Sequence, residues 1–278
     1  MKEPIEINGL AEIADRYDAF LIDQFGVLRD GRGPYSRAAE TLSALKAMPR
    51  RVIILSNSGK RSAVNAGRLA TLGFDPQSWD WFLTSGETAF RIMGKEMAGQ
   101  TGKCLLISRD GDTSPLDGLD IGRTDNAGDA DVILIAASEG DVYPLSHYEA
   151  MLAPAARRGV PCLCTNPDKI MLTQAGTAFG AGRIAELYEE MGGVVRWIGK
   201  PFPDIYAEAR GFLADVPAER ICCIGDSVEH DIAGAAAAGF ASILVTTGIL
   251  ENASAEDRTR LFEVHGAAPD FILPRFRM

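Results

Sequence analysis

Short runs of apolar residues alternate with stretches of helical periodicity along most of the chain. The apolar runs are nearly continuous rather than alternately polar, which is typical of strands that are buried on both faces. Their alternation with helices favours an α/β fold, here a doubly wound, Rossmann-like parallel sheet covered by helices on both sides. We expect strands at 18–23, 51–55, 103–107, 131–136, 160–164, 194–198, 221–224, 241–245 and 270–273, helices within 36–48, 181–191, 204–214 and 230–238, and a surface loop at 109–130.

Composition excludes several classes of partner. The formal net charge of −10 argues against a surface that binds nucleic acid or an anionic membrane. No apolar run approaches the roughly 20 residues that a membrane-spanning helix needs. The acidic start, "MKEPIEINGLAEIADRYD", lacks the apolar centre of a signal peptide, so a cytoplasmic location is expected.

The cysteines fit the same location. They are five in number, form no CxxC pair and lie in the apolar runs "KCLLIS", "PCLCTN" and "ICCIGD". In such runs a cysteine acts as a small buried hydrophobe. The three histidines are scattered, which argues against a zinc site. We therefore expect reduced, structural thiols in a reducing compartment.

Three of the expected strands end in polar residues suited to phosphate chemistry. Asp23 follows "DAFLI", Ser56 follows "RVIIL", and Asp226 follows "ICCIG". A further apolar run, "VVRWI", leads to Lys200. In open α/β sheets the ligand crevice lies outside the carboxyl ends of the strands. Parallel strands would thus bring these side chains to one edge.

The residue types at this edge indicate a reaction. Two carboxylates, a backbone carbonyl and waters are hard oxygen ligands of the kind that Mg²⁺ prefers. An ionised Asp23 could then attack phosphorus and form an aspartyl-phosphate. Ser56 and the backbone N–H groups at the start of the next helix could hold phosphoryl oxygens. Lys200 adds positive charge where negative charge gathers during transfer.

These segments resemble the four motifs of the haloacid dehalogenase superfamily of aspartate-nucleophile hydrolases. "DQFGVL" resembles the first motif, "ILSNS" the second, "GKPFPD" the third and "IGDSVEHDIAGA" the fourth. The long gap between the second and third motifs resembles the class IIA branch, which inserts a large α/β cap there. That branch includes p-nitrophenyl phosphate, pyridoxal phosphate and nucleotide monophosphate phosphatases. "TSGETA", "TNPDKI" and "GAGRIAELYEEMGG" extend the resemblance over essentially the whole chain.

The resemblance implies a core formed by 1–85 and 198–278, with an α/β cap at 86–197. It implies Mg²⁺-dependent hydrolysis of a small phosphorylated metabolite, and a homodimer formed through the cap is compatible with it. The cap of this branch sets the substrate, and the sequence singles out none of Arg109, His147 and Asp168. The implied roles are Asp23 as nucleophile and metal ligand, Asp226 as metal ligand, Ser56, Asn57 and Lys200 as phosphate ligands, and Asp231 as the residue that orients Lys200 or a metal-bound water.

Phe25 departs from the family pattern. Phosphatases of the superfamily usually carry a second aspartate two residues after the nucleophile, where it protonates the leaving oxygen and then activates water. The backbone carbonyl of Phe25 can still ligate Mg²⁺, but its side chain cannot move a proton and most simply packs. Loss of general acid–base catalysis is worth roughly 10²–10⁴-fold in rate.

This departure leaves two other functions open. The chain could be a phospho-ligand-binding or regulatory protein that lost turnover with the acid. It also resembles the dehalogenase members of the superfamily, which carry an aromatic residue near this position. That resemblance is weaker, because dehalogenases need no metal and insert their cap between the first and second motifs.

Overall fold

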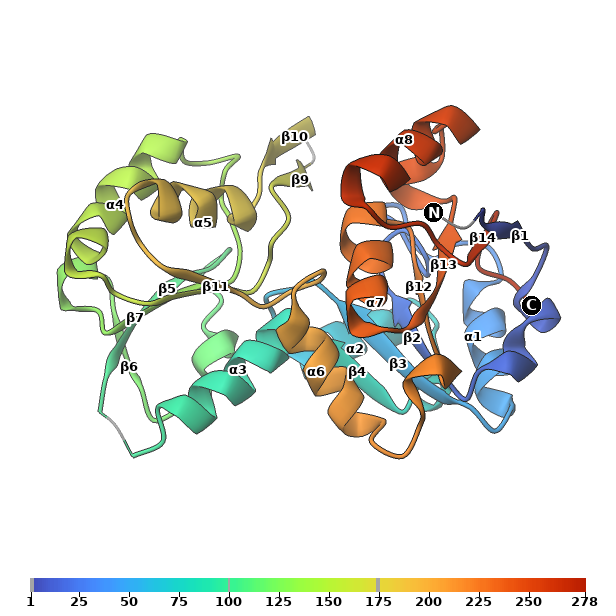
Figure 1. Cartoon of the computed structure of the whole chain (residues 1–278). Coiled ribbons are helices and arrows are strands. Elements are labelled where there is room, and N and C mark those ends of the chain that lie inside the picture. The colour runs from blue at the N-terminus through green and yellow to red at the C-terminus, as the bar shows by residue number, and fades with distance from the viewer. Residues whose placement is uncertain (1–2, 100, 174–175) are drawn as a thin grey trace. The chain divides into compact units, whose positions relative to one another are not determined.

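The computed structural model describes residues 3–99, 101–173 and 176–278. The chain forms two compact units, both of which can be traced in Figure 1. The first holds the chain up to Ser56 together with 63–83 and 200–278, and the second holds 57–62 and 84–199. Across the described ranges no helix is long and apolar enough to cross a membrane.

The first unit is built on a seven-stranded sheet in the order β1-β14-β13-β12-β2-β3-β4. The pairings from β1 through to β3 are all parallel. From the central pair β2 and β12, the chain continues outward through β3 and β4 on one side and through β13 and β14 on the other. The strand order therefore reverses between β2 and β12. The strands are β1 Ile5–Glu6, β2 Ala19–Asp23, β3 Arg51–Ser56, β4 Trp81–Thr84, β12 Ile221–Gly225, β13 Ala241–Val245 and β14 Phe271–Leu273.

Helices cover both faces of this sheet. Alternate residues of β2 enter different apolar clusters: Phe20 and Ile22 pack with α1 and α2, whereas Leu21 packs with α6 and α7. Burial on both sides explains why the strands read as nearly continuous apolar runs. The helices are α1 Ala38–Ala47, α2 Ser62–Thr71, α6 Pro203–Phe212, α7 Ala233–Ala238 and α8 Ala255–His265.

The second unit repeats this architecture at smaller size. Its five-stranded sheet has the order β11-β8-β7-β5-β6, and every pairing in it is parallel. Helices α4 and α5 cover one face and α3 covers the other. The elements are α3 Ser85–Glu96, β5 Lys103–Ile107, β6 Gly122–Thr124, β7 Val132–Ile135, α4 Leu145–Arg158, β8 Cys162–Cys164, α5 Ala181–Glu190 and β11 Val195–Trp197, with an antiparallel hairpin of β9 Ile170–Thr173 and β10 Gly176–Phe179.

Segment 57–62 packs within this second unit. Gly59 lies so close to the end of β7 that a Cβ there would be 1.9 Å from the carbonyl oxygen of Ala136. Lys60 Nζ lies 2.7 Å from Asp112 Oδ2. The guanidinium of Arg61 lies over the Phe90 ring, 3.3 Å from its centroid. The loop after β3 is thus held by groups of the second unit.

The predicted α/β fold with parallel sheets is confirmed, and all nine expected strands are present. The described residues contain five further strands, all of two to four residues: β1, β4, β6, β9 and β10. One of them, β6, lies in the expected loop 109–130. The expected helix 230–238 is instead a π-helical turn, Val228–Ile232, followed by the short α7.

The domain limits 1–85, 86–197 and 198–278 stay a proposal about independent folding. All five cysteines are buried and free, as predicted.

Candidate active site

The polar strand ends of the first unit meet where its strand order reverses. Asp23 is the last residue of β2, and Asp226 directly follows β12. Asp23 lies opposite Leu55 of β3, so Ser56 stands beside the end of β2. Such a reversal opens a crevice at the carboxyl ends of the two central strands, which is where open α/β sheets bind ligands.

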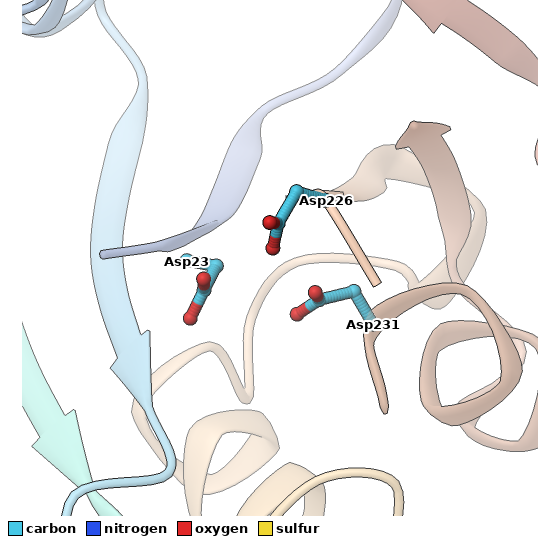
Figure 2. A group of neighbouring side chains, drawn as sticks. All are labelled: Asp23, Asp226 and Asp231. Carbon is cyan, nitrogen blue, oxygen red and sulfur yellow. The ribbon is translucent and has the colours of Figure 1, made fainter. Parts of the chain in front are cut away.

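A buried lysine joins two of the carboxylates. Lys200 Nζ lies 2.6 Å from Asp23 Oδ1 and 2.6 Å from Asp231 Oδ1. The lysine is only 3% exposed, and the two aspartates are 9% and 4% exposed. Figure 2 shows the carboxylates of Asp23, Asp226 and Asp231 turned toward a common space. Asp231 thus contacts Lys200, the residue that it is predicted to orient.

The π-helical turn after β12 positions Asp231. Ser227 caps it by accepting a hydrogen bond from the His230 N–H at 3.1 Å, and the Ser227 N–H donates to Asp231 Oδ2 at 3.1 Å. Gly225 makes room for this carboxylate, since a Cβ there would lie 2.0 Å from Asp231 Cγ. Single π-helical turns frequently occur at functional sites.

Two glycines enclose the carboxylate of Asp226. Gly26 and Gly248 both have positive φ, and a Cβ on either would lie 2.0 Å from Asp226 Oδ2. The Ile249 N–H donates to the same oxygen at 2.9 Å, and Thr247 Oγ1 donates to the Gly26 carbonyl at 2.6 Å. This 246–249 loop is not among the predicted site segments. Its only signal is "TTG" directly after an expected strand.

The acidic and basic side chains of the site do not match in number, and burial shifts their pKa values. Burial raises the pKa of Asp23 to about 7, against the lowering effect of Lys200. Burial also raises the pKa of Asp226 to about 8, and the charges of Asp23 and Asp231 add to that rise. Burial alone would lower the pKa of Lys200, but the two contacting aspartates outweigh it and the pKa is raised. One lysine therefore faces three buried carboxylates.

The donor set fits a divalent cation. One carboxylate oxygen from each of Asp23, Asp226 and Asp231 lies within 4.8 Å of the others. Carboxylates and backbone carbonyls are the ligands that Mg²⁺ takes. The surplus negative charge is what such an ion would offset, and the glycines on either side of Asp226 keep its oxygens clear of side-chain atoms.

Two of the predicted site residues, Asn57 and Phe25, have surroundings that the sequence does not predict. Asn57 belongs to the second unit, where its Nδ2 donates to Asp168 Oδ1 at 3.3 Å. The Phe25 side chain is 49% exposed, so it does not pack in the core as expected, although the Arg29 guanidinium lies 5.3 Å from its ring centroid. A carboxylate at position 25 would thus not be buried.

Two sequence models of haloacid dehalogenase-like hydrolase families match this chain. One, described as haloacid dehalogenase-like hydrolase, covers residues 20–122, and one described as HAD-hydrolase-like covers 197–277. Together they span most of the first unit. They include Asp23, Ser56, Lys200, Asp226 and Asp231.

Several known proteins are similar over most of the chain. D-glycerol 3-phosphate phosphatase of Mycobacterium tuberculosis is 27% identical over 246 residues, which is 86% of this chain and 66% of that protein. Sugar-phosphatase AraL of Bacillus subtilis is 27% identical over 256 residues, 91% of this chain and 88% of that protein. The crystal structure of glycerol phosphate phosphatase from M. tuberculosis in complex with magnesium superposes with a TM-score of 0.74 at 28% identity, covering 94% of this chain and 76% of that one.

Proposed function

The chain belongs to the haloacid dehalogenase-like hydrolases, and on this premise we propose that it hydrolyses a small phosphate monoester with Mg²⁺, through an aspartyl-phosphate on Asp23. Similarity to a glycerol phosphate phosphatase and a sugar phosphatase supports a phosphorylated metabolite as substrate. The magnesium complex of a related phosphatase supports the choice of ion.

The observation that carries the proposal is the pairing of Asp23 with Lys200 at the strand reversal. The lysine contacts Asp23 Oδ1 at 2.6 Å, which holds the carboxylate in one orientation and leaves Oδ2 for attack on phosphorus. Asp231, the lysine's other partner, fixes the ammonium group in place. The raised pKa of Lys200 keeps this group charged, so it can stabilise phosphoryl oxygens.

The other residues complete the site. Asp23, Asp226 and the Phe25 carbonyl would hold Mg²⁺, which when bound neutralises the carboxylates and the phosphoryl group. Ser56 at the end of β3 would donate to a phosphoryl oxygen. Asn57 would assist from the next position, provided that its amide leaves Asp168.

The test is phosphate release from a panel of monoesters with Mg²⁺, by the wild type and by Asp23→Asn. We expect release by the wild type, a phosphorylated Asp23 in acid-quenched protein, and loss of both in the variant. Undiminished release by Asp23→Asn would overturn the proposal.

One observation favours a second candidate, a phospho-ligand-binding protein without turnover. Phe25 stands where the acid–base residue would be, and its phenyl side chain can neither donate nor accept a proton. Tight Mg²⁺-dependent binding of phosphate esters with no phosphorylated Asp23 would establish this function instead. Retention of Asp226 and Asp231 makes a metal-free dehalogenase the weakest of the three readings.

A further inference from the structure

Phe25 is held rigidly on a tight turn. The Gly26 N–H donates to the Arg29 carbonyl at 2.7 Å, and the Leu28 N–H donates to the Gln24 carbonyl at 3.0 Å. The bond from Thr247 ties the same turn to the loop after β13. These bonds fix the backbone that carries the Phe25 ring.

The ring is covered on one side by a cation. The Arg29 guanidinium carbon lies 5.3 Å from the Phe25 centroid, in the range of a cation–π contact. Arg29 Nε and Nη2 both donate to the Asp30 carbonyl, which fixes the plane of the guanidinium. Even so, 49% of Phe25 is exposed. We call this pair of side chains, Phe25 backed by Arg29, the aromatic shelf.

The aromatic shelf lies next to the acidic group. Phe25 is two residues from Asp23 and one from Gly26, which approaches Asp226. Ile249, whose N–H bonds Asp226, is 70% exposed. Two exposed large apolar residues of the first unit, Phe25 and Ile249, thus stand at or next to backbone groups that contact Asp226.

The chemistry of the site calls for a particular leaving group. Without an acid at position 25, the bond from phosphorus to the leaving oxygen breaks with its electron pair staying on that oxygen, while Asp23 forms the new bond to phosphorus. The departing oxyanion takes its proton from water, and a second water releases phosphate from Asp23. This sequence is fast only when the leaving group spreads its charge, as aryl and enol oxyanions do.

We propose that the aromatic shelf binds the planar leaving group of an aryl or enol phosphate by stacking, an inference that rests on the proposed function. A ring with a cation on its far face favours an electron-rich or anionic planar partner on its open face, because the guanidinium offsets the negative charge of the ring's π face. The aromatic shelf and the absence of an acid at position 25 thus both favour aryl and enol phosphates as substrates.

The experiment compares planar with non-planar probes. Phenylphosphonate and cyclohexylphosphonate are similar in size and cannot be hydrolysed, so their Mg²⁺-dependent affinities report stacking alone. We expect the wild type to bind phenylphosphonate about 3- to 10-fold more tightly, the range for an aromatic pair. Phe25→Leu should abolish this ratio and Arg29→Met should reduce it. Val264→Ala, at an apolar residue 69% exposed on α8, is the control and should not change it.

Turnover separates this inference from the proposed function. If phosphate release depends on Asp23 but the wild type shows no phenyl preference, or keeps it in Phe25→Leu, the shelf is wrong and the function stands. If the preference is present and lost in Phe25→Leu while no ester is hydrolysed, the shelf stands and the hydrolase is wrong. Failure of both phosphonates to bind would overturn the shelf.

Discussion

The two units contain the same kind of parallel sheet, and both sheets reverse their strand order between two central strands. In the first unit this happens between β2 and β12, and in the second between β5 and β7. The first reversal collects three buried carboxylates and one lysine. At the second, Gly59 lies against the end of β7, and Arg109 forms a bidentate pair with Asp141 at 2.7 Å.

The difference shows that the fold supplies a crevice but not its use. At the second reversal the chain fills the space with its own loop, and the polar groups are satisfied there: Ser138 Oγ donates to the Phe179 carbonyl and Thr165 Oγ1 to that of Ile135. At the first, surplus charge stays buried. Unbalanced charge, rather than sheet topology, marks the candidate site.

The largest expected effect is on activity, which should fall after a substitution at the first strand reversal but not after one at the second. Asp23→Asn should lower phosphate release by at least about 10³-fold, because an amide cannot act as the nucleophile. Asp141→Asn, at the second reversal, should change it by less than about fivefold, since that ion pair is partly exposed. Equal losses in the two variants would erase the distinction between the sites.

Stability should separate the units in the same direction. Lys200→Met leaves buried carboxylates without their cation and should lower the free energy of unfolding of the metal-free protein by about 3 kcal/mol. Lys60→Met breaks a more exposed pair in the second unit and should cost about 1 kcal/mol or less. Urea unfolding, followed by probes in each unit, would measure both changes. A larger loss from Lys60→Met would contradict the comparison.

The open crevice should also accept the missing acid. Phe25→Asp is expected to raise turnover of alkyl phosphates about tenfold or more, part of the roughly 10²–10⁴-fold that acid–base catalysis supplies. Because position 25 is half exposed, the added carboxylate should cost little stability. Phe25→Asn is the matched control, and steady-state rates on folded protein are the measurement. No gain over Phe25→Asn would place the proton donor elsewhere.

The smallest effect concerns charge in the metal-free protein. Asp226→Asn removes a buried acid whose pKa is raised to about 8, and which therefore costs stability at neutral pH, while its side-chain oxygen can still accept from Ile249. Stability at pH 7 should thus rise by about 1 kcal/mol, or roughly 2–4 °C in melting temperature. The same variant should lose the thermal shift caused by Mg²⁺. Asp112→Asn in the second unit, which removes the charge that pairs with Lys60, should bring no such gain. An undiminished Mg²⁺ shift in Asp226→Asn would remove that residue from the metal site.

The sequence predicts the parts of the molecule that depend on local pattern. Asp23, Ser56 and Asp226 each end an apolar strand, so parallel topology alone brings them together. The sequence does not predict that Gly248 lies against Asp226 or that Gly59 lies against the end of β7, because these contacts join segments far apart in the chain. Nor does the sequence predict β9 and β10, because the short segments "IMLT" and "GTAF" carry no pattern that shows that they pair with each other outside the main sheet.

The strand pairing at the first reversal has a consequence for biosynthesis. Ala19 of β2 pairs with Ile221 of β12, whereas the second sheet is complete once residue 197 has emerged from the ribosome. A nascent chain arrested before β12 should therefore have a protease-resistant second unit and a cleavable first one. Until β12 arrives, one edge of β2 offers unpaired backbone groups to other chains. The segment at greatest risk of aggregation during translation is thus the strand that ends in Asp23.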